Sequence, residues 1–150
     1  MINLFYLFCI YIIYIMVKRH TRKHTKTSPY SPSNIILTFL EILTTIKLFH
    51  WKTTQYSVHK ATDELYSSIQ DNMDTFIEQL MGTLDSRINM TSHSIPICDC
   101  NTLESFKTHI IRFKKYLENL KLPSNYYDLY TVRDEILGSV NKFIYLYSLK

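Results

Sequence analysis

Two histidines and two carboxylates near the middle of the chain have residue types and spacing that suit a metal site. His50 is followed along the chain by His59, Asp74 and Glu78. Imidazole nitrogens and carboxylate oxygens together form mixed ligand sets that suit divalent iron, manganese or zinc. Coordination positions left open by the protein would admit oxygen or peroxide. These four residues are therefore the candidate metal ligands.

The spacing of these residues limits where such a site can form. On one predicted helix, His59 and Asp74 lie roughly 22 Å apart, because a helix rises about 1.5 Å per residue. Two copies packed antiparallel about a two-fold axis would bring His59 of one chain to Asp74 and Glu78 of the other. Within one chain, His59 and Asp63 are one helical turn apart and could join His50 in a mononuclear site. Both arrangements remain open.

Four amphipathic helices are predicted to position the candidate ligands, because apolar residues recur at helical spacing. In the first helix His50 continues the apolar stripe, so it should face the core. Gly82 is the expected C-cap of the second helix, and Asn101 with Glu104 is the expected capping box of the third. The expected helices cover about residues 34–54, 59–81, 101–122 and 125–148.

The segment between the second and third helices has no clear period. Residues 83–100 contain Pro96 and are interpreted as a long crossover, which can join helices that run in the same direction. A short turn, a long crossover and another short turn are the connectivity of a ferritin-like bundle. The predicted fold class is all-α, a four-helix up-down bundle, ferritin-like, with a long crossover between helices 2 and 3.

The chain is predicted to have one folded domain, residues 34–150, after two N-terminal segments. Residues 1–17 are hydrophobic and short for a membrane span, so they are either an anchor or translated upstream sequence with Met16 as the natural start. Location is expected to be cytoplasmic or virion-associated, and membrane-anchored if residues 1–17 are retained. Residues 18–33 form a basic linker that contains Ser and Pro.

The net charge of +4 comes from the basic linker, which holds five of the 17 Lys and Arg residues. The rest of the chain is nearly neutral, with 12 basic against 13 acidic residues. Such an arm would attract DNA or an anionic membrane through its positive charge, or would simply aid solubility. The candidate contacts are Lys18, Arg19, Arg22, Lys23 and Lys26.

Glycine and cysteine content excludes several classes of site. The chain has two glycines, so glycine-rich phosphate loops are absent. Its three cysteines, Cys9, Cys98 and Cys100, form no Cys-x-x-Cys pair, which argues against a disulfide framework and against a cysteine-rich zinc site. The run Cys98-Asp99-Cys100 is interpreted as crossover sequence.

Three runs in the first two predicted helices resemble the Dps family of miniature ferritins, which protect DNA from iron and peroxide. The resemblance implies a ferritin-like fold with ferroxidase sites across a two-fold interface. It places His50, His59, Asp74 and Glu78 at the ferroxidase ligands, with Asp74 bridging and Glu78 holding a second metal. The runs are Leu48-Phe49-His50-Trp51, His59-x3-Asp63-Glu64-Leu65-Tyr66 and Asp74-x3-Glu78.

The same resemblance implies Fe(II) oxidation, self-association through the second helix and DNA binding. Trp51, beside the site, would intercept one-electron by-products, or would simply pack in the core. The link between His50 and His59 is shorter than in typical members, a feature shared with a ferritin-like group from large DNA viruses and phages. The alternative function is a non-catalytic ferritin-like scaffold, acting as a membrane-anchored or nucleic-acid-binding structural protein.

Overall fold

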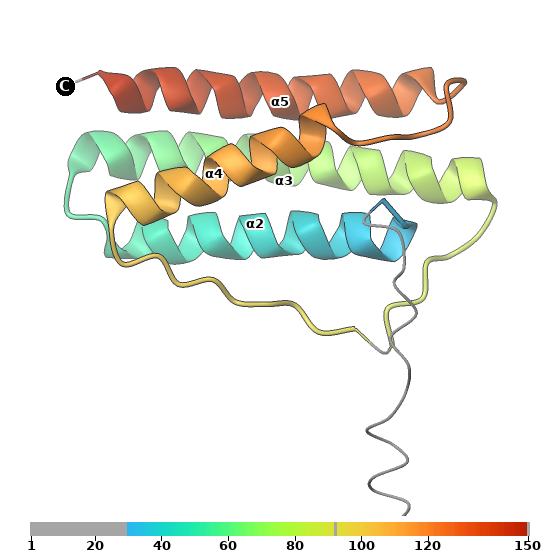
Figure 1. The fold of residues 1–150 in the computed structure, drawn as a ribbon, viewed down its shortest axis with the longest axis horizontal. Helices are drawn as coiled ribbons and strands as arrows, with labels where there is room; N and C mark the ends of the chain where they lie inside the picture. The colour runs from blue at the N-terminus through green and yellow to red at the C-terminus, as the bar shows by residue number, and fades with distance from the viewer. Residues whose placement is uncertain (1–29, 92, 150) are drawn as a thin grey trace, which may run out of the picture.

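The computed structural model describes residues 30–91 and 93–149, and every regular element within these ranges is an α-helix (Figure 1). The expectation of an all-α chain with four helices is confirmed. Residues 1–17 and the basic residues from Lys18 to Lys26 lie outside the described residues, so the expectations for them stay predictions. The helices are α2 (Pro32–Lys52), α3 (Tyr56–Leu84), α4 (Leu103–Glu118) and α5 (Tyr127–Ser148).

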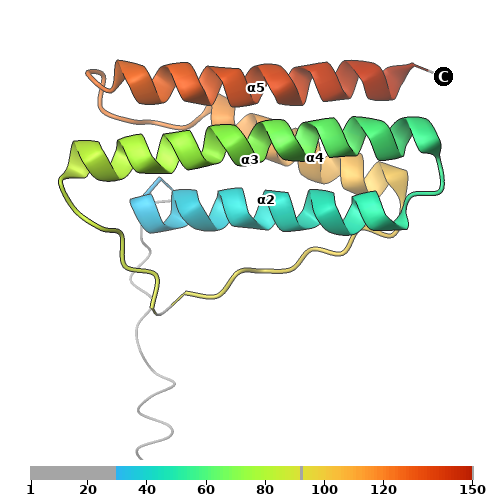
Figure 2. The same ribbon diagram turned by 180° about the vertical axis from the view of Figure 1, so that it is seen from behind.

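Side-chain contacts fix the directions in which the helices run. Ser68 of α3 hydrogen-bonds Ser139 of α5 at 2.7 Å, and Glu64, one turn earlier, pairs with Lys142, so α3 and α5 are antiparallel. Lys52, the last residue of α2, hydrogen-bonds Asn101 just before α4 begins, which makes α2 and α4 antiparallel as well. Figures 1 and 2 show the same arrangement from both sides.

The segment between α3 and α4 follows from these directions. α2 and α3 form a hairpin, and so do α4 and α5, so α3 and α4 run the same way. Residues 93–102 therefore return along α2 to reach the start of α4 (Figure 1). This path places the loop residues just before α4 beside the C-terminal end of α2.

Aromatic side chains dominate the core between the helices. The Phe39 ring lies 5.4 Å from that of Phe76 and 5.9 Å from that of Phe113, so α2, α3 and α4 meet around it. Phe49 stacks on Phe106 with 4.1 Å between ring centroids. The apolar stripes expected from the sequence are largely buried, although Ile36, Met73, Leu103 and Tyr147 are only partly covered.

The start of α2 lies two residues before the predicted position. Ser31 is the N-cap and its hydroxyl accepts a hydrogen bond from the backbone N–H of Asn34 at 3.4 Å. Pro32 occupies the first turn, where its missing N–H has no intrahelical partner to lose. The linker expected to end at residue 33 therefore ends before Pro32.

Both ends of α3 differ from the sequence-based prediction. The helix begins at Tyr56 and not at His59, so the turn after α2 has three residues, 53–55. Gly82 is not the C-cap, because the helix continues to Leu84. Asp85 ends it in the left-handed conformation, with φ 48° and ψ 37°, which a short polar side chain tolerates.

The expected capping box of α4 is displaced by one residue. Thr102 is the N-cap, and its hydroxyl accepts from the Ser105 N–H at 3.1 Å while the Ser105 hydroxyl accepts from the Thr102 N–H at 3.2 Å. Asn101 and Glu104 are not the cap. This box fixes the orientation of the first turn of α4, directly after Cys98 and Cys100.

Helix α2 is long and apolar enough to cross a membrane, with a mean hydropathy of 1.3 over its most apolar window. Eight of its residues are buried in this structure, including His50. A helix at the core of a folded domain has the same composition as a span, so this feature alone does not indicate a membrane.

Candidate functional site

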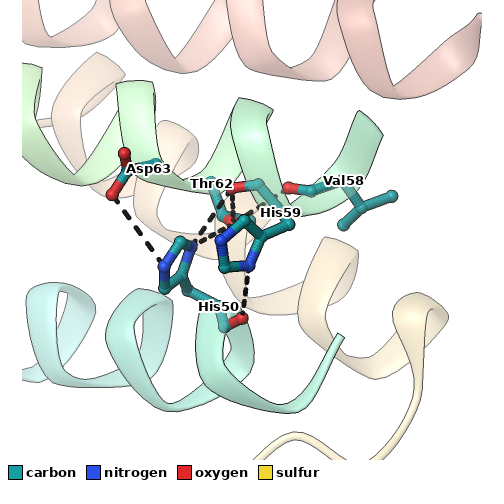
Figure 3. A network of polar contacts seen from close by, with 5 residues as sticks. All are labelled: His50, Val58, His59, Thr62 and Asp63. Carbon is teal, nitrogen blue, oxygen red and sulfur yellow. Dashed lines mark hydrogen bonds and ion pairs between the residues drawn. The ribbon is translucent and has the colours of Figure 1, made fainter. Parts of the chain in front are cut away.

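The three-residue turn between α2 and α3 sets His50 and His59 face to face. Their rings stack with 3.9 Å between centroids and an angle of 24° between planes (Figure 3). His50 ends the buried stripe of α2, and His59 lies in the first turn of α3. The short link thus allows the two imidazoles to converge within one chain.

Each imidazole is held by the backbone of the other histidine. His50 Nδ1 lies 3.1 Å from the His59 carbonyl oxygen, and His59 Nδ1 lies 3.2 Å from the His50 carbonyl oxygen (Figure 3). A carbonyl only accepts, so both Nδ1 atoms carry the proton of the neutral ring. The Nε2 atoms of both rings are then left with free lone pairs, the form in which histidine binds metals.

Thr62 completes the support of His50. Its hydroxyl lies 3.1 Å from His50 Nδ1 and donates to the Val58 carbonyl at 2.9 Å, so it accepts from the imidazole. Thr62 is fully buried and His50 is 7% exposed. The other ring nitrogen, His50 Nε2, lies 3.9 Å from Asp63 Oδ1 at the partly exposed edge of the pair. His50 is therefore a buried, hydrogen-bonded histidine whose Nε2 faces a carboxylate.

We predict that Thr62→Val lowers the free energy of unfolding by about 0.5 to 1.5 kcal/mol, because the buried Nδ1–H of His50 loses one of its two acceptors and keeps the His59 carbonyl. Urea denaturation followed by circular dichroism measures the change. Thr75→Val is the matched control: Thr75 is on the same helix, with the same hydrogen bond to the carbonyl four residues back, but is exposed. Equal effects of the two substitutions would contradict a special role for Thr62.

The remaining predicted ligands lie farther along α3. Asp74 and Glu78 are exposed, and within the described part of the chain neither carboxylate forms an ion pair or a hydrogen bond. The structure thus brings His50 and His59 together with Asp63 and leaves Asp74 and Glu78 apart, as the spacing requires. Among the described residues, the ligand atoms of His50, His59 and Asp63 do not all lie within 4.8 Å of one another.

Trp51 does not pack in the core of the chain. Its side chain is 68% exposed, next to the buried His50 in sequence. The packing interpretation is wrong for a single chain because Trp51 is one residue past the core-facing position, about 100° around the helix. The indole is left on the surface beside the turn that carries the two histidines.

A second ligand cluster was missed by the sequence prediction. Cys98 Sγ lies 3.0 Å from His109 Nε2 and 4.0 Å from Cys100 Sγ. The ligand atoms of these three residues all lie within 4.8 Å of one another. Residues 98–100 lie in the segment between α3 and α4 as expected, but the expectation that they are isolated is wrong, because their two thiols lie beside His109 of α4. A His nine residues after a Cys-x-Cys run was the available signal.

Burial changes the acidity of one of these thiols. Cys100 is 3% exposed, and burial, together with the neighbouring Cys98, raises its pKa to about 11. A thiol with a pKa this high is protonated at neutral pH. Cys98 and His109 are only partly buried.

Comparison with known proteins gives one match. No curated protein and no solved structure matches the chain. The model of a family of unknown function, DUF5856, matches residues 50–147, which begin at His50 and include both ligand clusters. Because this match covers about two thirds of the residues, the chain belongs to the DUF5856 family.

Proposed function

We propose that the protein is a Dps-like, ferritin-like iron-binding protein that oxidises Fe(II) at sites shared by two copies of the chain. One observation carries this proposal. His50 and His59 are both held through Nδ1 by backbone carbonyls, so both Nε2 atoms are available to a metal. A backbone carbonyl that orients a ligating histidine is a common second partner in metal sites.

The arrangement of the helices supports a ferritin-like bundle. α3 and α4 run in the same direction, joined by the long segment of residues 85–102, and the other connections are short. A four-helix bundle with one long crossover has this connectivity. In such bundles metal sites are built from side chains of facing helices, which here would be α2 and two copies of α3.

Positions on α3 support the shared site. Successive residues are rotated by about 100°, so His59, Asp63 and Asp74 fall within about 60° of one another around the helix. Two α3 helices packed antiparallel with His59 opposite Asp74 would place the two-fold axis next to Tyr66. Exposed Asp74 and Glu78 would then complete the ligand set of the neighbouring chain.

The chemistry expected at such a site uses iron as the substrate. His50 and His59 would donate neutral Nε2 atoms, while the Asp74 and Glu78 carboxylates of the second copy would offset the charge of the iron. Two ferrous ions would each give one electron to hydrogen peroxide, which with two protons would leave as water. Exposed Trp51 lies next to His50 in the chain and would be the nearest aromatic side chain to intercept one-electron by-products.

The test is Fe(II) oxidation by the purified full-length chain with hydrogen peroxide, followed as ferric absorbance over time. We expect oxidation faster than in protein-free buffer and saturation at a fixed number of irons per pair of chains. Oxidation no faster than in buffer, from protein that is helical by circular dichroism, would contradict the proposal and favour a non-catalytic scaffold.

A further inference from the structure

Cys98, Cys100 and His109 form a cluster that the iron chemistry does not use. The two cysteines end the segment between α3 and α4, and His109 lies two turns into α4. Their ligand atoms all lie within 4.8 Å of one another. Two sulfurs and one imidazole nitrogen are a donor set for a borderline or soft cation, and a poor one for Mg²⁺ or Ca²⁺.

We propose that Cys98, Cys100 and His109 bind one Zn²⁺ ion. A tetrahedral zinc ion with usual bond lengths holds two thiolate sulfurs about 3.8 Å apart, and a sulfur and an imidazole nitrogen about 3.6 Å apart. The corresponding distances here are 4.0 Å between the sulfurs and 3.0 Å from Cys98 Sγ to His109 Nε2. The sulfur–sulfur distance is thus close to zinc geometry, the Cys98 Sγ–His109 Nε2 distance must lengthen by about 0.6 Å, and the third pair of ligand atoms lies within 4.8 Å.

Neighbouring contacts hold the cluster in place before any ion binds. Lys52 of α2 pairs with Asp99, the residue between the two cysteines, and also hydrogen-bonds Asn101. The capping box of Thr102 and Ser105 orients the first turn of α4. The loop and the helix that carry the ligands are thus fixed to each other and to α2.

Three protein ligands leave a fourth coordination position. The Asp99 carboxylate pairs with Lys52, so it does not supply the fourth ligand. Cys100 is buried, whereas Cys98 and His109 are partly exposed, so the ion would be reached from solvent. His109 also lines a hollow of about 200 Å³ between α2 and α4, with Thr45 and Arg112 among its walls. Water or another small donor would fill the fourth position.

The experiment is titration of the reduced full-length protein with Co²⁺, which reports thiolate ligands through a near-ultraviolet charge-transfer band, followed by competition with Zn²⁺. We expect one equivalent of Co²⁺ per chain and loss of the band when Zn²⁺ displaces it. Cys98→Ser and Cys100→Ser should remove the band, and His109→Gln should weaken Zn²⁺ binding at least tenfold. Circular dichroism shows whether each variant is folded.

Three control variants separate this site from other ligands. Cys9→Ser and His93→Gln should keep the band, because neither residue belongs to the cluster. Cys9 is the third cysteine of the chain, and His93 is an exposed loop histidine. His59→Ala should also keep it, which distinguishes the zinc site from the proposed iron site. A band that survives Cys98→Ser in folded protein, or reduced wild-type protein that shows no band, would overturn the proposal.

Discussion

Oligomers assembled from a mixture of His59→Ala and Asp74→Ala chains are expected to oxidise Fe(II), although neither variant does so alone. If His59 of one chain meets Asp74 of another, a mixed pair has one site with both substitutions and one site with neither. Random pairing makes about half of the pairs mixed, so about a quarter of the wild-type sites should be restored. A site within one chain would gain nothing from mixing.

The measurement is the initial rate of ferric absorbance for each variant and for the two variants refolded together. Asp71→Ala is the matched control, since Asp71 is an exposed carboxylate on the same helix one turn before Asp74. It should retain wild-type oxidation, whereas each ligand variant should lose the saturable phase. Activity that is lost in both variants but not restored by mixing would contradict the shared site, while full activity in both would exclude these ligands.

The second large effect concerns the stability of the fold. Phe39→Ala is expected to lower the free energy of unfolding by about 3 to 5 kcal/mol, because it leaves a cavity where α2, α3 and α4 meet. Phe39 is fully buried and contacts the rings of Phe76 and Phe113. Helices packed on three sides cannot all move inward to fill the space. Urea denaturation of the full-length chain gives the value.

An exposed aromatic residue provides the control for this substitution. Tyr145→Ala removes a ring of similar size from α5, where the side chain is 64% exposed. Its effect should stay within about 0.5 kcal/mol. Comparable losses from Phe39→Ala and Tyr145→Ala would mean that the core around Phe39 does not hold the helices together.

The number of helices and their buried faces could be predicted because these properties are local. Phe39, Ile46 and His50 recur at helical spacing, and all three are buried. A link that contains Pro123 separates α4 from α5 as expected, but it covers residues 119–126, because α4 ends at Glu118 and α5 begins at Tyr127. Each helix is stabilised by burying one apolar face. The helical spacing of apolar residues therefore indicates which face packs against the core.

The helix ends could not be predicted as well, because several residues can serve each end. Gly82 was the expected C-cap of α3, yet Asp85 adopts the left-handed conformation and the Ser86 N–H bonds the Met81 carbonyl. Gln55 starts α3 without a side-chain cap, so no sequence signal marks that position. Tertiary contacts of the final turns decide between such alternatives.

The candidate sites also differ in how far the sequence could predict them. The pairing of His50 with His59 depends on a short turn between two helices. Both helices could be predicted from the sequence, so the two histidines could be placed near each other. The contact of Cys98 with His109 spans 11 residues and depends on how the loop just before α4 turns against that helix, which periodicity does not encode. In the proposed shared site a second copy would bring Asp74 and Glu78 to the histidines, an arrangement that no property of a single chain determines.

The paired histidines also have a consequence for the order of folding. Their contacts join residues only nine positions apart, so closing this loop loses little chain entropy. Local contacts form sooner than distant ones, and the α2–α3 hairpin should therefore form before α4 returns along it. The two imidazoles would then be aligned early, before the packing of α4 and α5 completes the bundle.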